Sequence, residues 1–74
     1  MYSVLISKKE DEEKIQERNF DTREAEANKY FNLLKIDMIS HSSDDYFDIV
    51  EEIKYSDIRI SLIKDDEEIL YIVK

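Results

Sequence analysis

Residues 58–73 of this 74-residue chain have the sequence IRISLIKDDEEILYIV. Two apolar segments, 58–63 and 69–73, flank the polar turn Asp65-Asp66-Glu67. β-Branched and aromatic residues on both sides of a short polar turn are typical of a β-hairpin. We therefore expect two antiparallel strands here, joined by an acidic tip.

A second hairpin is predicted at the start of the chain. Residues 2–7, YSVLIS, are mostly apolar or β-branched and alternate as a strand does. A lysine and an acid cluster, Glu10-Asp11-Glu12-Glu13, follow and lead to Ile15, which is the order of residue types in 62–69. The two segments form a loose repeat. Both are predicted to be hairpins with acidic tips.

A helix is predicted to follow this hairpin. In Asp21-Thr22-Arg23-Glu24, an N-cap acid is followed three positions later by glutamate, the spacing of a capping box. Apolar residues then recur at helical spacing. They are Ala27, Tyr30, Phe31 and Leu34. The helix should extend to about Ile36, and the polar segment Ser40-His41-Ser42-Ser43 should be a loop.

Residues 44–54 favour a second helix. Ser43 can cap it, and an apolar face again has the spacing i, i+3, i+4, i+7. Its members are Tyr46, Ile49, Val50 and Ile53. The competing interpretation is a strand, because Phe47, Ile49, Ile53 and Tyr55 share a two-residue period. The fold class expected for residues 1–74 is a single small α+β domain of order ββααββ, an antiparallel sheet with two helices on one face.

Composition excludes several kinds of active site. The chain has no glycine, no proline and no cysteine. Phosphate-binding loops, dinucleotide fingerprints and nucleophile elbows need glycine, while disulfides and thiolate zinc sites need cysteine. His41 is expected to be a solvated loop residue, and Asp65–Glu68 lacks the ligand spacing and glycine of an EF-hand loop. We expect no enzymatic activity, no cofactor and no metal site.

The longest apolar run, residues 69–73, is far shorter than the roughly 20 residues of a membrane-spanning helix. The first residues, Met1 to Val4, also lack the features of a secretory signal. The expected location is the cytoplasm, with no partner in a membrane.

Charge is distributed unevenly along the chain. Residues 1–36 carry eight acidic and seven basic side chains, whereas residues 37–74 carry eleven and four, so the second half holds nearly all of the net charge of −8. Such a surface repels nucleic acid and attracts basic protein surfaces. On a helix over 44–54, five carboxylates would lie within an arc of about 120°, opposite the apolar face. They are Asp44, Asp45, Asp48, Glu51 and Glu52.

This acidic stripe predicts a partner-binding surface, with Phe47 as an anchor at its margin. The tip Asp65, Asp66, Glu67 and Glu68, and Glu10–Glu13, would extend the surface if the fold brings them together. The alternatives are that the acids form an ordinary solvated face and that Phe47 belongs to the core.

In size, acidity and lack of catalytic motifs, the chain resembles the small acidic proteins of phages and mobile elements. This resemblance implies an inhibitor of the anti-CRISPR or anti-restriction type, in some cases a DNA mimic. Its partner would be the basic nucleic-acid-binding surface of a host protein, and it would not bind nucleic acid itself.

The alternative function is an oligomerising structural or regulatory module. Strand 69–73 would lie at a sheet edge and pair with another chain, including a second copy as a homodimer. A third possibility is an antitoxin-like protein that neutralises a basic toxin by the same acidic mechanism.

Overall fold

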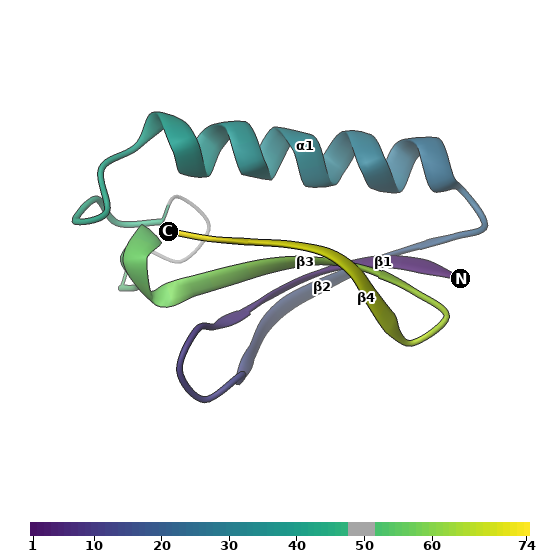
Figure 1. Ribbon diagram of the computed structural model, residues 1–74, viewed down its shortest axis with the longest axis horizontal. Helices are drawn as coiled ribbons and strands as arrows, with labels where there is room; N and C mark the ends of the chain where they lie inside the picture. The colour runs from purple at the N-terminus through teal and green to yellow at the C-terminus, as the bar shows by residue number, and fades with distance from the viewer. Residues whose placement is uncertain (48–51) are drawn as a thin grey trace.

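A four-stranded antiparallel sheet with one helix on one face makes up the described part of the chain, residues 1–47 and 52–74 of a computed structural model (Figure 1). The elements in chain order are β1 (Tyr2–Lys8), β2 (Lys14–Asp21), α1 (Glu24–Ser40), the short 3-10 helix η1 (Tyr55–Asp57), β3 (Ile58–Lys64) and β4 (Glu67–Val73). The order across the sheet is β2-β1-β3-β4. The predicted α+β class, the antiparallel sheet and both hairpins are confirmed.

The two central strands, β1 and β3, come from opposite ends of the described chain. Val4 pairs with Leu62 and Ile6 with Ile60, and each of these side chains is at most 1% exposed. Because side chains alternate between the faces of a sheet, these four lie together on the side that α1 covers. Each such buried aliphatic side chain contributes about 1.5–3 kcal/mol to folding. The core therefore lies between α1 and the middle of the sheet.

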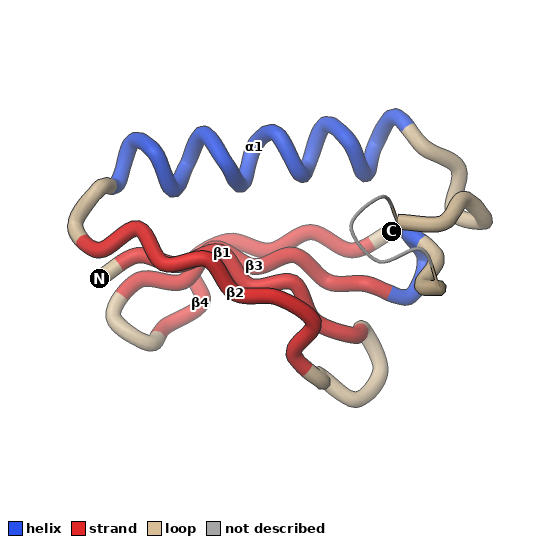
Figure 2. Tube along the Cα trace, turned by 180° about the vertical axis from the view of Figure 1, so that it is seen from behind, coloured by secondary structure: helices blue, strands red, loops and turns tan. Residues whose placement is uncertain are grey.

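The helix covers the sheet with one apolar stripe. Its buried residues are Ala27, Phe31, Leu34 and Met38, spaced three and four apart. Met38 adds a turn to the stripe beyond Leu34, which explains why α1 extends to Ser40 rather than ending near Ile36. In Figure 2 the helix lies on one side, and no other described element covers the opposite face of the sheet.

The predicted N-cap of α1 is wrong by two residues. The helix begins at Glu24, and Arg23 occupies the N-cap position without a side-chain capping hydrogen bond. Asp21 instead ends β2 with a positive φ of 53°. Arg23 secures the turn by donating from Nε to the carbonyl oxygen of Phe20 at 3.0 Å and by pairing with Glu26 at 2.8 Å.

The predicted helix over 44–54, and with it the order ββααββ, is also wrong. The described residues contain one α-helix, and residues 41–47 and 52–54, between α1 and η1, are not helical; Tyr46 and Lys54 form an isolated bridge. Asp45 accepts a hydrogen bond from the Ser42 amide at 2.8 Å, and such local bonds compete with helix formation. Phe47 and Tyr55, nearly fully buried, pack edge to face with ring centroids 5.4 Å apart. Both rings lie in the core.

Candidate interaction surfaces

The second helix, on which the acidic stripe was predicted, is absent from the described residues. Asp44, Asp45 and Glu52 are exposed and lie between α1 and η1, while Asp48 and Glu51 lie outside the described residues. Phe47 is 1% exposed and belongs to the core, which is the alternative that the sequence left open.

One end of the molecule nevertheless gathers acids from different segments. Glu10 and Asp11, from the turn between β1 and β2, line a depression together with Glu52 and Asp57. The Lys9 amide donates to the Asp57 carbonyl oxygen at 2.8 Å, which fixes the tip of the first hairpin against η1. We call Glu10, Asp11, Glu52 and Asp57 the acidic end.

Basic side chains partly offset this charge. Lys8 lines the same depression and pairs with Glu13 at 3.1 Å. The hydrogen bond and attraction from the Glu13 carboxylate raise the pKa of Lys8. The acidic end is therefore a mixed surface in which the carboxylates are in the majority.

The tip Asp65–Glu68 lies at the other end of the sheet. Tyr2 pairs with Lys64, so the turn between β3 and β4 adjoins the start of β1, away from the turn after Lys8. Asp65 pairs with the N-terminal ammonium group, whose hydrogen bond and charge lower the pKa of this carboxyl. Consequently, the fold brings the first acidic tip, at Glu10 and Asp11, close to Glu52. The second acidic tip, Asp65–Glu68, lies apart from them at the other end of the sheet.

Glu68 is held by β3. Its carboxylate pairs with the Arg59 guanidinium and accepts a hydrogen bond from the Ser61 hydroxyl at 3.0 Å. The hydrogen bond from Arg59 lowers the pKa of Glu68 and raises that of Arg59. Arg59 also lies over the Tyr71 ring at 4.0 Å. These contacts fasten β4 to its neighbour on the open face of the sheet.

β4 is an edge strand with an apolar surface. Its hydrophobic side chains are largely exposed: Ile69 47%, Leu70 51%, Tyr71 57% and Val73 37%. The main contacts of α1 with the sheet are to β1, β2 and β3, so the helix leaves most of β4 uncovered. We call Ile69, Leu70, Tyr71 and Val73 the β4 edge. The sequence predicted the strand and suggested its place at an edge.

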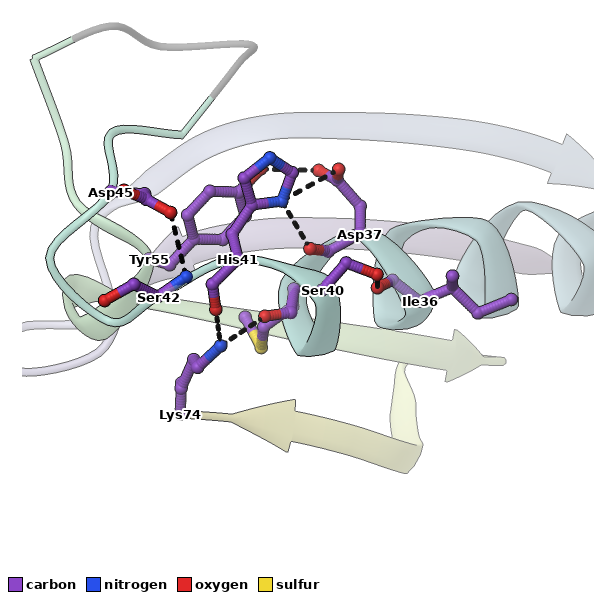
Figure 3. Close-up of polar contacts among 9 residues, drawn as sticks. Ile36, Asp37, Ser40, His41, Ser42, Asp45, Tyr55 and Lys74 are labelled. Carbon is purple, nitrogen blue, oxygen red and sulfur yellow. Dashed lines mark hydrogen bonds and ion pairs between the residues drawn. The ribbon is translucent and has the colours of Figure 1, made fainter.

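His41 lies directly after α1, partly exposed as a loop residue would be, and it is also part of a polar cluster at the end of the helix that the sequence did not indicate (Figure 3). Its ring stacks on Tyr55 with centroids 4.8 Å apart, and its Nδ1 lies 2.8 Å from the Asp37 carbonyl oxygen. Tyr55 donates its hydroxyl to Asp37 at 2.6 Å. Lys74 donates from Nζ to the carbonyl oxygens of Met38 and His41. The cluster caps the helix and joins it to the chain after β4.

Sequence reasoning missed this cluster because its members are far apart in the chain. Lys74 lies 36 residues from Met38, and Tyr55 lies 18 from Asp37. No local spacing indicates such pairs. The role of His41 is explained by helix capping and ring stacking.

Within residues 1–47 and 52–74, no group of three or more His, Cys, Asp or Glu residues has the arrangement to hold a metal ion. None of the helices in the described ranges is long and apolar enough to cross a membrane.

These features define the class of the protein only as a small α+β protein with one apolar and one acidic candidate surface. No family model, curated protein or solved structure matches the chain.

Proposed function

We propose that this protein is a non-enzymatic interaction module and that β4 is the element that binds its partner. The observation that carries this proposal is the β4 edge, a run of exposed apolar side chains on a strand with one neighbour. An edge strand presents unpaired amide and carbonyl groups on its free side, which another strand can satisfy. Pairing would also shield the apolar side chains from water.

The acidic end and the acidic tip Asp65–Glu68 are weaker evidence for a partner-binding site than the β4 edge is. Two of the acids at the second tip, Asp65 and Glu68, already pair within the chain, and Lys8 is among the side chains that line the depression of the acidic end. By contrast, the β4 edge is apolar and uncovered by α1. Oligomerisation, the alternative function expected from the sequence, accordingly becomes the leading proposal.

Lysine substitutions test this proposal. Leu70→Lys/Val73→Lys places two cations on β4, which disfavours pairing at an edge. Leu33→Lys/Ile36→Lys is the matched control, since it makes the same chemical change at the exposed α1 residues Leu33 and Ile36. We expect associations, in a bacterial lysate or of the purified protein with itself, to be lost in the β4 variant and kept in the α1 variant. Associations that persist in a folded β4 variant would contradict the proposal.

A second candidate function is the acidic inhibitor. The observation in its favour is the convergence of Glu10, Asp11, Glu52 and Asp57 from two distant segments on one depression. These carboxylates, together with Asp44 and Asp45, would pair with Arg and Lys in a basic nucleic-acid-binding groove of a cytoplasmic host protein. The surface is smaller than the predicted stripe and contains no aromatic anchor from Phe47.

Charge reversal separates this candidate from the first. Glu10→Lys/Glu52→Lys should abolish binding to such a protein, and added salt should weaken the wild-type complex. The control is Asp66→Lys/Glu67→Lys, which makes the same charge change at the other end of the sheet. Equal loss in both variants would show that net charge acts without a defined site, and no loss in either would reject the inhibitor.

A further inference from the structure

We infer that β4 pairs with the β4 strand of a second copy of this chain, antiparallel and centred on Tyr71. This inference rests on the proposed function, because it names the partner of the same edge. Three features of the molecule support it: the difference between the two edges of the sheet, the faces on which the β4 side chains lie, and the charges that flank those side chains.

The two edge strands differ in how well they are protected against pairing. β2 has the sequence KIQERNFD, with exposed Lys14, Glu17 and Arg18, and its pairing with β1 is interrupted by two register shifts. Charges and bulges of this kind hinder the addition of another strand. The pairing of β4 with β3 has one register shift, at the start of β4, and residues 69–73 carry no charged side chain. The sheet is therefore less protected against strand addition along β4 than along β2.

In two copies of β4, side chains of the same kind can meet on each face of the sheet. Leu70 and Ile72 pair with Leu62 and Ile60, so they lie on the α1 side of the sheet, and Tyr71 pairs with Ser61 on the open side. In an antiparallel pair of strands related by a twofold axis, residues opposite each other lie on the same face of the sheet. The axis must therefore pass between the two copies of one residue, which lies opposite itself. Only a few registers satisfy this condition.

Strand regularity and charge select one of these registers. Centred on Tyr71, Leu70 faces Ile72 of the second copy and Tyr71 faces Tyr71, so apolar side chains meet on both faces. Centred on Leu70, the register would place Tyr71 and Ile72 opposite the start of β4, where the register shift between Leu70 and Glu68 interrupts the regular strand. Centred on Ile72, the register would place Leu70 opposite Lys74. The Tyr71 register keeps its three central residues, 70–72, in the regular part of β4 and opposite apolar side chains.

The ends of the strands favour the antiparallel direction. β4 begins with Glu67 and Glu68. Parallel pairing would place these acidic starts together, where like charges repel, whereas antiparallel pairing keeps them apart. Glu68 and Lys74 already make contacts within their own chain, to Arg59 and to the carbonyl oxygens of Met38 and His41. The antiparallel direction is thus favoured because it avoids repulsion.

Disulfide cross-linking tests this register directly, because the chain contains no cysteine and each variant introduces one thiol. Residues opposite each other on antiparallel strands have the separation that a disulfide needs. Tyr71→Cys should therefore oxidise to a covalent dimer. Tyr46→Cys is the matched control, a tyrosine of nearly equal exposure, 56% against 57%, that lies in the loop after α1.

The purified wild-type protein should show a mass of twice 8.9 kDa by light scattering as its concentration rises, and Leu70→Lys should return it to the mass of one chain. Each copy carries a net charge of −8, so salt should strengthen this dimer. A monomer at every concentration, or equal cross-linking of Tyr71→Cys and Tyr46→Cys, would overturn the inference. Preferential cross-linking of Leu70→Cys would overturn the Tyr71-centred register.

Failure of this inference is distinguishable from failure of the proposed function. Suppose that the wild-type protein is monomeric, and that the β4 lysine variant no longer captures a protein that the α1 variant still captures. Then β4 binds a different protein, and only the inference that its partner is a second copy of this chain is wrong. If β4 substitutions change no association of any kind, both proposals fail together.

Discussion

Asp65 and Asp66 have φ angles of 50° and 68°, and they form the turn between β3 and β4. Two successive residues in the left-handed region form a type I′ turn, where Asn-Gly or Asp-Gly is preferred. The chain has no glycine, so an aspartate takes the second position and bears a steric cost of about 1 kcal/mol. The register of the hairpin is fixed by two strained acids.

Asp66→Gly should therefore stabilise the protein by up to about 1 kcal/mol, which raises the melting temperature by roughly 4–8 °C in a domain of this size. Asp66 is the better of the two positions, since Asp65 holds the N-terminal ammonium group. Thermal denaturation followed by circular dichroism measures the effect. Asp44→Gly is the control, because Asp44 lacks a positive φ and should lose stability instead. A fall in melting temperature for Asp66→Gly would contradict the expectation.

At the scale of elements, the attachment of β4 to β3 should depend on pH. Arg59 lowers the pKa of Glu68 below its ordinary value of 4.5. The ion pair therefore stabilises the fold above the unfolded pKa, and this contribution is lost as pH falls through the folded pKa. We expect less than about 1 kcal/mol, since the two side chains are 29% and 35% exposed.

Comparison with Glu68→Gln measures this contribution, because the variant cannot ionise at residue 68. The wild-type protein should be more stable at pH 7, and the difference should shrink below about pH 4.5. Hydrogen exchange of the β4 amides should show the same trend. A difference that stays constant down to pH 2.5 would mean that the ion pair contributes nothing through its charge.

Elements with unambiguous periodicity were predictable, and those with mixed periodicity were not. The spacing of Ala27, Phe31 and Leu34 predicted α1, and the apolar segments predicted β1, β3 and β4, whereas β2 was expected only from the loose repeat of the hairpin pattern. Ile49 and Ile53 fitted both the helical spacing with Tyr46 and the strand spacing with Phe47 and Tyr55, so local pattern could not decide between helix and strand. In the structure Phe47 and Tyr55 are buried in the core without belonging to an α-helix or a strand, an arrangement that depends on the shape of the core beneath α1.

At the scale of the whole molecule, the net charge of −8 opposes the compact state. Salt screens this repulsion, so raising the concentration of NaCl should increase the melting temperature by a few degrees. Glu10→Lys/Glu52→Lys brings the net charge to −4 and should reduce the salt effect. Denaturation at several salt concentrations tests this, and an equal response in both proteins would contradict it.

The grouping of the acids is also a property of the whole molecule. The sequence indicated the acidic segments 10–13 and 65–68 and Glu52, but not Asp57, and the neighbours of these acids depend on pairings between distant segments. Lys9 meets Asp57, and Met1 meets Asp65, because β1 lies beside β3. Local patterns contain no information about such pairs, so one predicted acidic surface became two separate ones.

The central place of β1 determines the order in which the fold can be completed. Of the four strands, β1 is synthesised before the others and can pair with β2 as soon as β2 is made, but its other neighbour, β3, begins only at Ile58. A nascent chain on the ribosome can form the first hairpin and α1. One edge of β1 stays unpaired, and part of the apolar face of α1 stays uncovered, until β3 and β4 have been synthesised. Pairing across so long a sequence separation is slow and leaves the chain open to association with other chains meanwhile. Folding should finish only after synthesis of nearly the whole described chain.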